Sequence, residues 1–326
     1  MEGVTTKIYR GKVKSVEILE NGEALVHFRD DITAGDGVKR DRLQGKGTVN
    51  CKTSSFIFRK LEKAGIPTHF IREVNENTFL ARALEILPVE VVVRNIAAGS
   101  FCRRYGYEQG FMFNTPVVEF FYKDDELHDP LISKDVILKL GLATELELQW
   151  MESAALRVNS VLTSLFKEAG LILVDFKIEV GKDKQGRLYV ADEISGDSIR
   201  VWDAETHEIL DKDRFRKGLG EVVKNYEEIW RRISTVENDP KPEPFHLQIE
   251  VIPKATVPNP SGDVVKRGIV NLGSKTVEKV VVGKTILLSY PSEILAGDWR
   301  KELSEICLSF LSNPLIEDYK IQVVPK

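Results

Sequence analysis

Residues 173–193 read LVDFKIEVGKDKQGRLYVADE, and this pattern predicts two strands joined by the turn GKDKQG. Side chains two apart in a strand point to the same face. Asp175, Lys177 and Glu179 therefore share one face, while apolar residues occupy the other. With a hairpin loop of about four residues, Asp192 would lie opposite Lys177 on the charged face.

Three carboxylates around one lysine repel one another unless a ligand neutralises them. Mg²⁺ binds carboxylate and phosphate oxygens, so such a face suits a metal–phosphate complex, with the lysine paired to a substrate anion. The alternative from alternation alone is a half-exposed strand with solvated salt bridges. The next segment, DEISGDSIR, adds Asp197, Ser198 and Arg200. It is either an ordinary polar loop or, together with the strand, part of a metal–phosphate pocket.

Other segments carry groups suited to anions, each with a plainer explanation. The glycine turn YRGKVK offers Lys12 and Lys14 to a phosphate, but it lacks the GxxxxGK[ST] pattern and is plainly explained as a solvated basic turn. Arg94 and Ser100 in PVEVVVRNIAAGS suggest an anion clamp or an internal ion pair. Asp129 in LHDPLIS suggests a turn cap.

The composition of the chain excludes several classes of protein. A net charge of -4 over 326 residues argues against a general nucleic-acid binder. The three cysteines form no CxxC pair, which predicts no disulfides and a cytoplasmic location. The first residues lack a signal-peptide core, and no apolar run reaches the ~20 residues that span a bilayer. The five histidines form no zinc-binding spacing.

The proline-rich segment 234–244, STVENDPKPEP, predicts a linker between domains at 1–233 and 245–326. In the first domain, strand-like runs come early and helices later, the strongest at 144–170 and another at 213–233 with Leu219 on its buried stripe. This order predicts an α+β fold. The second domain reads β-α-β-β-α-β, with two strands around Gly283, and predicts a two-layer sandwich with one sheet face free for a partner.

Two of these motifs resemble the signatures of one family. LPVEVVVRNIAAGS (87–100) and LVDFKIEVG (173–181) resemble those of SAICAR synthetase, phosphoribosylaminoimidazole-succinocarboxamide synthase. YRGKVK, LHDP and DKDRFRKGLG also fit, and the resemblance covers about residues 5–233. After the linker, GDVVKRGIVNLG and VEKVVVGKTILL resemble the PurS-like small subunit of formylglycinamidine ribonucleotide synthetase, over about 245–326.

The first resemblance implies an ATP-dependent ligase of purine biosynthesis with a two-lobed fold. It would join L-aspartate to 4-carboxy-5-aminoimidazole ribotide (CAIR), giving SAICAR, ADP and phosphate through an acyl phosphate. The cofactors would be ATP and Mg²⁺. The second resemblance implies an assembly role with the large synthetase and glutaminase subunits. We also expect a homo-oligomer, of a size that the sequence leaves open.

The resemblance further implies roles for individual residues. The ATP phosphates would meet Lys12, Lys14 and Lys123, and adenine would meet the backbone of residues 86–88, including Ile86 and Leu87. Glu179 and Asp192 would hold Mg²⁺. The ribotide would bind Arg94, Ser100, Asp129, Asp175, Lys177 and Arg200, of which Lys177, Asp175 and Arg94 would be catalytic.

Some positions depart from the family patterns. Gly196 stands where a proline is common, and Ile199 replaces a hydroxyl residue. In the second domain, Asn259 and Val281 replace an aspartate and an arginine. The alternative function is a related phosphotransferase acting on another acceptor, with the second domain serving only as an oligomerisation or scaffold module.

Overall fold

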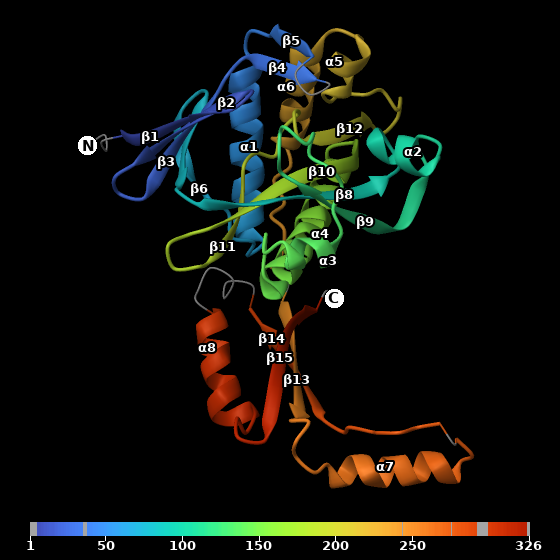
Figure 1. Cartoon of the computed structure of the whole chain (residues 1–326). Helices are drawn as coiled ribbons and strands as arrows, with labels where there is room; N and C mark the ends of the chain where they lie inside the picture. The colour runs from blue at the N-terminus through green and yellow to red at the C-terminus, as the bar shows by residue number, and fades with distance from the viewer. Residues whose placement is uncertain (1–4, 35–37, 243, 275, 292–298, 325–326) are drawn as a thin grey trace. The chain divides into compact units, whose positions relative to one another are not determined.

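The computed structural model describes residues 5–34, 38–242, 244–274, 276–291 and 299–324 (Figure 1). The chain divides into two compact units, Met1–Glu243 and Pro244–Lys326. The division lies in the segment expected to be a linker. The start of that segment is held on the first unit, because Asp239 accepts hydrogen bonds from Lys60 and Lys63 at 2.9 and 2.8 Å.

An antiparallel sheet forms the N-terminal lobe of the first unit, in the order β1-β2-β3-β7-β6. Its strands are β1 (Thr5–Arg10), β2 (Lys14–Leu19), β3 (Glu23–Phe28), β6 (Phe70–Asn75) and β7 (Thr78–Arg82). Helix α1 (Lys46–Lys63) packs on β3, β6 and β7. Phe58 and Phe79 meet edge to face between helix and sheet, and both are fully buried.

A second antiparallel sheet has the order β11-β10-β8-β9, with β12 also paired to β10. Its strands are β8 (Glu85–Ile96), β9 (Met112–Tyr122), β10 (Leu171–Lys182), β11 (Leu188–Ala191) and β12 (Ile199–Asp203). Helix α4 (Glu145–Glu168) packs on β8 and β10. Thr144 and Glu147 start this helix as a reciprocal capping box.

Shorter elements complete the first unit (Figure 1). They are β4 (Asp31–Ala34), β5 (Lys39–Arg42), α2 (Ser100–Tyr105), α3 (Lys134–Lys139), α5 (Asp213–Lys217) and α6 (Val222–Ile233). The single helix predicted for 213–233 is wrong, because the backbone turns left-handed at Gly218 and Gly220 and divides it into α5 and α6. Leu219, expected on its buried stripe, is 49% exposed.

The described residues of the second unit form a sheet in the order β14-β13-β15 and two α-helices. The elements are β13 (Phe245–Pro253), α7 (Pro260–Asn271), β14 (Lys284–Tyr290), α8 (Trp299–Ile306), a π-helical turn (Cys307–Leu311) and β15 (Glu317–Val324). The predicted combination of a sheet with helices in this unit is confirmed. The strand expected before Gly283 is not formed, because residues 276–283 make no ladder in the described part of this unit.

Helix α7 presents apolar side chains to solvent. Among its twelve residues, all described, Gly262 alone is buried. Val264 is 59% exposed and Val270 is 45% exposed. The two-layer sandwich predicted for this domain would bury this face of α7 against the sheet. In the described part of the unit, the face is exposed instead.

Candidate active site

The register of β8 and β10 gathers charged side chains on one face of the second sheet. Asp175 lies opposite Arg94, and Glu179 opposite Glu90. Asp175 and Glu179 are only 3% and 4% exposed. The alternative of a solvated strand face is therefore wrong. We call Glu90, Arg94, Asp175, Lys177 and Glu179 the polar face.

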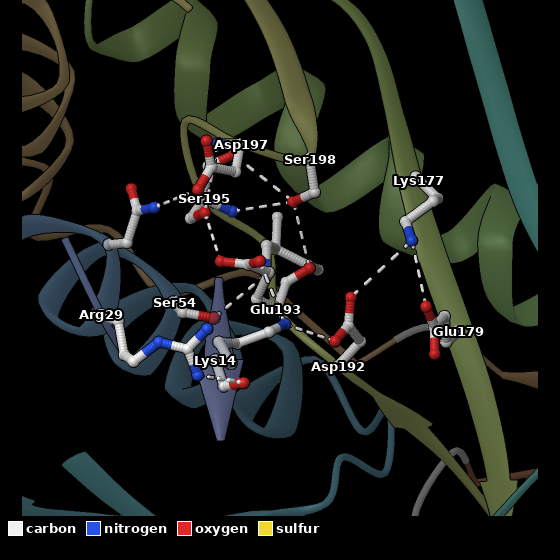
Figure 2. A network of polar contacts seen from close by, with 12 residues as sticks. Lys14, Arg29, Ser54, Lys177, Glu179, Asp192, Glu193, Ser195, Asp197 and Ser198 are labelled. Atoms are coloured by element: carbon white, nitrogen blue, oxygen red, sulfur yellow. Dashed lines mark hydrogen bonds and ion pairs between the residues drawn. The ribbon is translucent and has the colours of Figure 1, made fainter. Parts of the chain in front are cut away.

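Lys177 is the centre of this polar face. Its ammonium lies 2.7 Å from Glu90 Oε1, 3.0 Å from Glu179 Oε1 and 3.8 Å from Asp192 Oδ2 (Figure 2 shows the last two). Burial alone would lower the pKa of Lys177, but Glu179, Asp192 and Glu90 raise it well above its ordinary value. Burial raises the pKa of Glu90, and Lys177 only partly offsets this. Lys177 is therefore a permanent cation among three carboxyl groups.

Asp192 reaches this cluster by a different route from the one predicted. β10 and β11 pair with Glu179 opposite Ala191, so continuing the ladder would put Glu193, not Asp192, opposite Lys177. The strand ends at Ala191, and Asp192 adopts a left-handed φ of 68°. This turn brings its carboxylate to Lys177. The predicted register is thus wrong by one residue, although the predicted neighbourhood is correct.

The three lysines expected at a nucleotide differ in their surroundings. Lys14 contacts Asp192 and lies 3.0 Å from Glu193 Oε1, and Lys123 lies 2.5 Å from Glu179 Oε1. Lys12 instead pairs with exposed Asp125 at 2.8 Å. Burial tends to raise the pKa of Asp192, but Lys14, Lys177 and Lys123 hold it well below its usual range. Two of the three lysines therefore join the carboxylate cluster.

A second group of ions lies further along β8 and β10. Arg94 donates to Glu119 and to Asp175, each at 2.6 Å, and to Ser100 at 3.4 Å. Arg200 donates to Asp175 at 2.8 Å. Of the residues expected at an anionic substrate, the structure thus brings together Arg94, Ser100, Asp175 and Arg200.

The remaining predicted site residues lie elsewhere. Asp129 accepts a hydrogen bond from the Asp124 backbone at 2.9 Å, so its carboxylate closes its own turn, as expected of a capping aspartate. Ile86 is 38% exposed at the start of β8, whereas Leu87 is buried. The backbone of this segment lies beside β10, where Ile86 is opposite Gly181.

Several residues of the site were not singled out from the sequence. Glu90 shares a face with Arg94 in β8, so period-two alternation could have identified it. Glu119 comes from β9, which carries no local signal, and Glu193 comes from the segment DEISGDSIR, of which only other residues were singled out. These two carboxylates become partners of Arg94 and Lys14 only through the pairing of distant strands.

Replacing Arg94 by methionine is expected to destabilise the first unit by about 3–5 kcal/mol, because Glu119 and Asp175 would remain buried without their partner. Urea unfolding of the full chain, followed by tryptophan fluorescence, measures this change. The matched control is Arg59→Met, whose pair with Glu73 at 3.2 Å is exposed and is worth less than about 1 kcal/mol. Equal losses in both variants would contradict the structural role of Arg94.

Mg²⁺ is the metal that this donor set fits. Among the described residues, no group of three or more His, Cys, Asp or Glu side chains is arranged to hold a metal ion. Glu179 and Asp192 instead supply two carboxylates around one lysine. Mg²⁺ commonly binds one or two carboxylates and completes its shell with waters and substrate phosphates. The pair therefore fits a metal that arrives with a nucleotide.

Comparison with known proteins identifies the family. The family model described as SAICAR synthetase matches residues 7–233. The chain belongs to the SAICAR synthetase family. A phosphoribosylaminoimidazole-succinocarboxamide synthase of Methanocaldococcus jannaschii is 51% identical over 226 residues, which cover 69% of this chain and 93% of that protein. One of Parvibaculum lavamentivorans is 46% identical over 240 residues, 72% and 95% of the two chains.

Solved structures agree with this family. The phosphoribosylaminoimidazole-succinocarboxamide synthase of Ehrlichia chaffeensis has a TM-score of 0.69 and 42% identity, covering 72% of this chain and all of that one. A SAICAR synthetase in complex with ADP has a TM-score of 0.69 and 43% identity, covering 73% and 100%. The predicted α+β fold is confirmed, and the first unit is a SAICAR synthetase-type ligase of purine biosynthesis.

The second part of the chain matches a different family model. PurS, described as phosphoribosylformylglycinamidine (FGAM) synthase, matches residues 246–325. The predicted combination of the two families in one chain is confirmed. Among the described helices, none has the length and apolar character needed to cross a membrane.

Proposed function

We propose that the first unit joins L-aspartate to CAIR, with ATP converted to ADP and phosphate. The observation that carries this proposal is the polar face, where Lys177 lies in β10 between Asp175 and Glu179, which belong to two different groups of ions. On one side are the Glu179 and Asp192 carboxylates with Lys14 and Lys123. On the other side, Arg94, Asp175 and Arg200 form an arginine-rich group suited to an acidic sugar phosphate.

A chemical need explains why the two groups lie side by side. A free carboxylate is a poor electrophile because its oxygen is a very poor leaving group. In the proposed first step, the CAIR carboxylate oxygen attacks the γ-phosphorus, and the bond to the β-phosphate oxygen breaks to release ADP. In the second step, the aspartate amine attacks the acyl carbon, loses a proton and displaces phosphate. The protein mainly has to align the reactants and neutralise charge.

The proposed roles follow from position and charge. Glu179 and Asp192 hold Mg²⁺, which neutralises charge on the phosphates when bound. Lys12, Lys14 and Lys123 contact the phosphates, and the backbone of residues 86–88 contacts adenine. Lys177 and Arg94 hold the CAIR carboxylate and phosphate, with Ser100, Asp175, Arg200 and Asp129 around them. The Asp129 carboxylate also closes its own turn.

The test of this proposal is a steady-state assay of the full chain with ATP, Mg²⁺, CAIR and L-aspartate. The expected result is ADP release that requires all substrates, with one succinocarboxamide product per ADP by mass spectrometry. Reactions without aspartate are the control. A phosphorylated product that forms at the same rate without aspartate would contradict the ligase and favour the related phosphotransferase.

For the second unit, we propose an assembly role with the large synthetase and glutaminase subunits of formylglycinamidine ribonucleotide synthetase. The PurS match and the exposed apolar face of α7 support this role. Co-expression of the chain with both subunits, followed by size exclusion, is expected to give one complex. Elution of all three as separate species at micromolar concentration would contradict it.

A further inference from the structure

Glu193 is a buried carboxylate to which the proposed function gives no role. It is 4% exposed and follows the end of β11. Its Oε1 lies 3.0 Å from the Lys14 ammonium, and its Oε2 accepts a hydrogen bond from the Ser195 hydroxyl at 2.7 Å (Figure 2). Both carboxylate oxygens are therefore engaged, one by the N-terminal lobe and one by its own loop.

The loop around Glu193 is held from several sides. The Glu193 carbonyl accepts from the Ser198 hydroxyl at 3.1 Å, and that hydroxyl accepts from the Ser195 backbone at 3.0 Å. The Ile194 backbone donates to the Ser54 hydroxyl in α1 at 3.0 Å. These bonds fix the backbone on both sides of Glu193, so its carboxylate has little freedom to move.

Lys14 is held at its backbone as well as at its ammonium. The Gly11 backbone donates to the Lys14 carbonyl at 2.9 Å, which closes the turn before β2. Arg29 donates to the same Lys14 carbonyl at 2.9 Å and to the Gly11 carbonyl at 2.8 Å. The start of the Lys14 side chain is thus fixed, and the carboxylates around its ammonium decide where its charge points.

Asp192 and Glu193 differ as partners of Lys14. The Asp192 side chain is 22% exposed and also faces Lys177, whereas that of Glu193 is 5% exposed and bound by Ser195. If Asp192 turns to Mg²⁺, the Lys14 ammonium keeps Glu193 as its fixed anion. A long side chain that is already oriented loses less conformational freedom when its ligand binds.

We propose that Glu193 is a positioning residue: it keeps the Lys14 ammonium directed at the nucleotide phosphates while Asp192 serves the metal. This inference rests on the proposed function, because it assumes that Lys14 meets ATP. Burial alone would lower the pKa of Lys14, and the two carboxylates raise it above its ordinary value. Glu193 thus also helps Lys14 to stay charged in a buried position.

The test is Glu193→Gln in the full chain, which keeps the size of the side chain and an acceptor for Ser195. Losing one charge-assisted bond is expected to weaken ADP binding about 10-fold in Mg²⁺ by calorimetry. In EDTA, where Asp192 stays with Lys14, we expect the loss to be less than about 3-fold. The KM for ATP should rise about 10-fold while kcat stays within about 3-fold.

Two further variants make the test specific. Ser195→Ala leaves the Glu193 charge but removes its tether, and should weaken ADP binding about 3-fold in the same direction. Glu147→Gln is the matched control, because Glu147 in α4 makes a comparable ion pair with Lys182 in β10 at 3.2 Å. This variant should leave ADP binding unchanged. The thermal unfolding midpoint of each variant shows whether weaker ADP binding comes from lost positioning of Lys14 or from loss of the fold.

The outcomes distinguish this inference from the proposed function. If Glu193→Gln is folded and binds ADP in Mg²⁺ as tightly as the wild type, the positioning role is wrong, and so it is if kcat falls with ADP affinity unchanged. Neither result would affect the proposed ligase. If the wild-type chain binds no ADP and forms no succinocarboxamide, the proposed function itself is wrong.

Discussion

Lys177→Ala is expected to lower kcat by about 10³-fold, in the range seen when one charge-stabilising group is removed. The ammonium lies within 4 Å of Glu90, Glu179 and Asp192. Without it, the three carboxyl groups face the incoming phosphates and the CAIR carboxylate with only Lys14 and Lys123 left to neutralise them. The reaction would therefore lose charge neutralisation at the point where its two anionic reactants meet.

The same substitution should leave the fold intact. The Lys177 side chain is 28% exposed, so its removal leaves space that water can enter, and Lys123 and Lys14 still pair with Glu179 and Asp192. Steady-state kinetics together with thermal unfolding measure both properties. The control is Lys134→Ala, whose exposed pair with Glu152 lies outside the site. A Lys177→Ala enzyme with wild-type kcat would contradict the proposed pocket.

Asp192→Asn is expected to lower kcat about 10²-fold and to raise the Mg²⁺ concentration needed for half-maximal activity. The amide removes one of two carboxylates proposed for the metal, and also a charge that faces Lys14 and Lys177. Asparagine tolerates left-handed backbone, so the φ of 68° at this position is preserved. The loss of activity would therefore report charge rather than a distorted loop.

Magnesium titrations at saturating ATP, CAIR and aspartate measure this effect. Asp135→Asn is the control, because Asp135 is an exposed residue at the start of α3 that pairs with Lys139 at 2.9 Å. An Asp192→Asn enzyme whose magnesium dependence and kcat match the wild type would exclude Asp192 as a metal ligand.

The faces of strand β10 in the second sheet could be predicted from the sequence, because strand alternation is a local property. Asp175, Lys177 and Glu179 lie on one face as their spacing requires, with Phe176 and Ile178 buried on the other. The register of β10 with β11 was predicted incorrectly, by one residue. It depends on the geometry of the turn, and a shift of one residue exchanges the two faces.

Glu90 could have been identified from alternation in β8, but Glu119 and Glu193 become site residues only through long-range pairing. Arg94 pairs with Glu119 only because β9 lies beside β8. Lys14 in β2 pairs with Glu193 only because the N-terminal sheet packs next to the loop after β11. In the second unit, the order β-α-β-β-α-β predicts a helix after the first strand, and α7 forms there. Its expected packing on the sheet does not, because burial of a helix depends on what else is present to cover it.

A crystal structure of the full chain with ADP, Mg²⁺ and CAIR is the most direct test of the proposed site. We predict a metal bound by Glu179 and Asp192, the ADP phosphates next to Lys14 and Lys123, and the CAIR carboxylate beside Lys177. Nucleotide bound away from the polar face, with Lys177, Glu179 and Asp192 free of ligand, would contradict it.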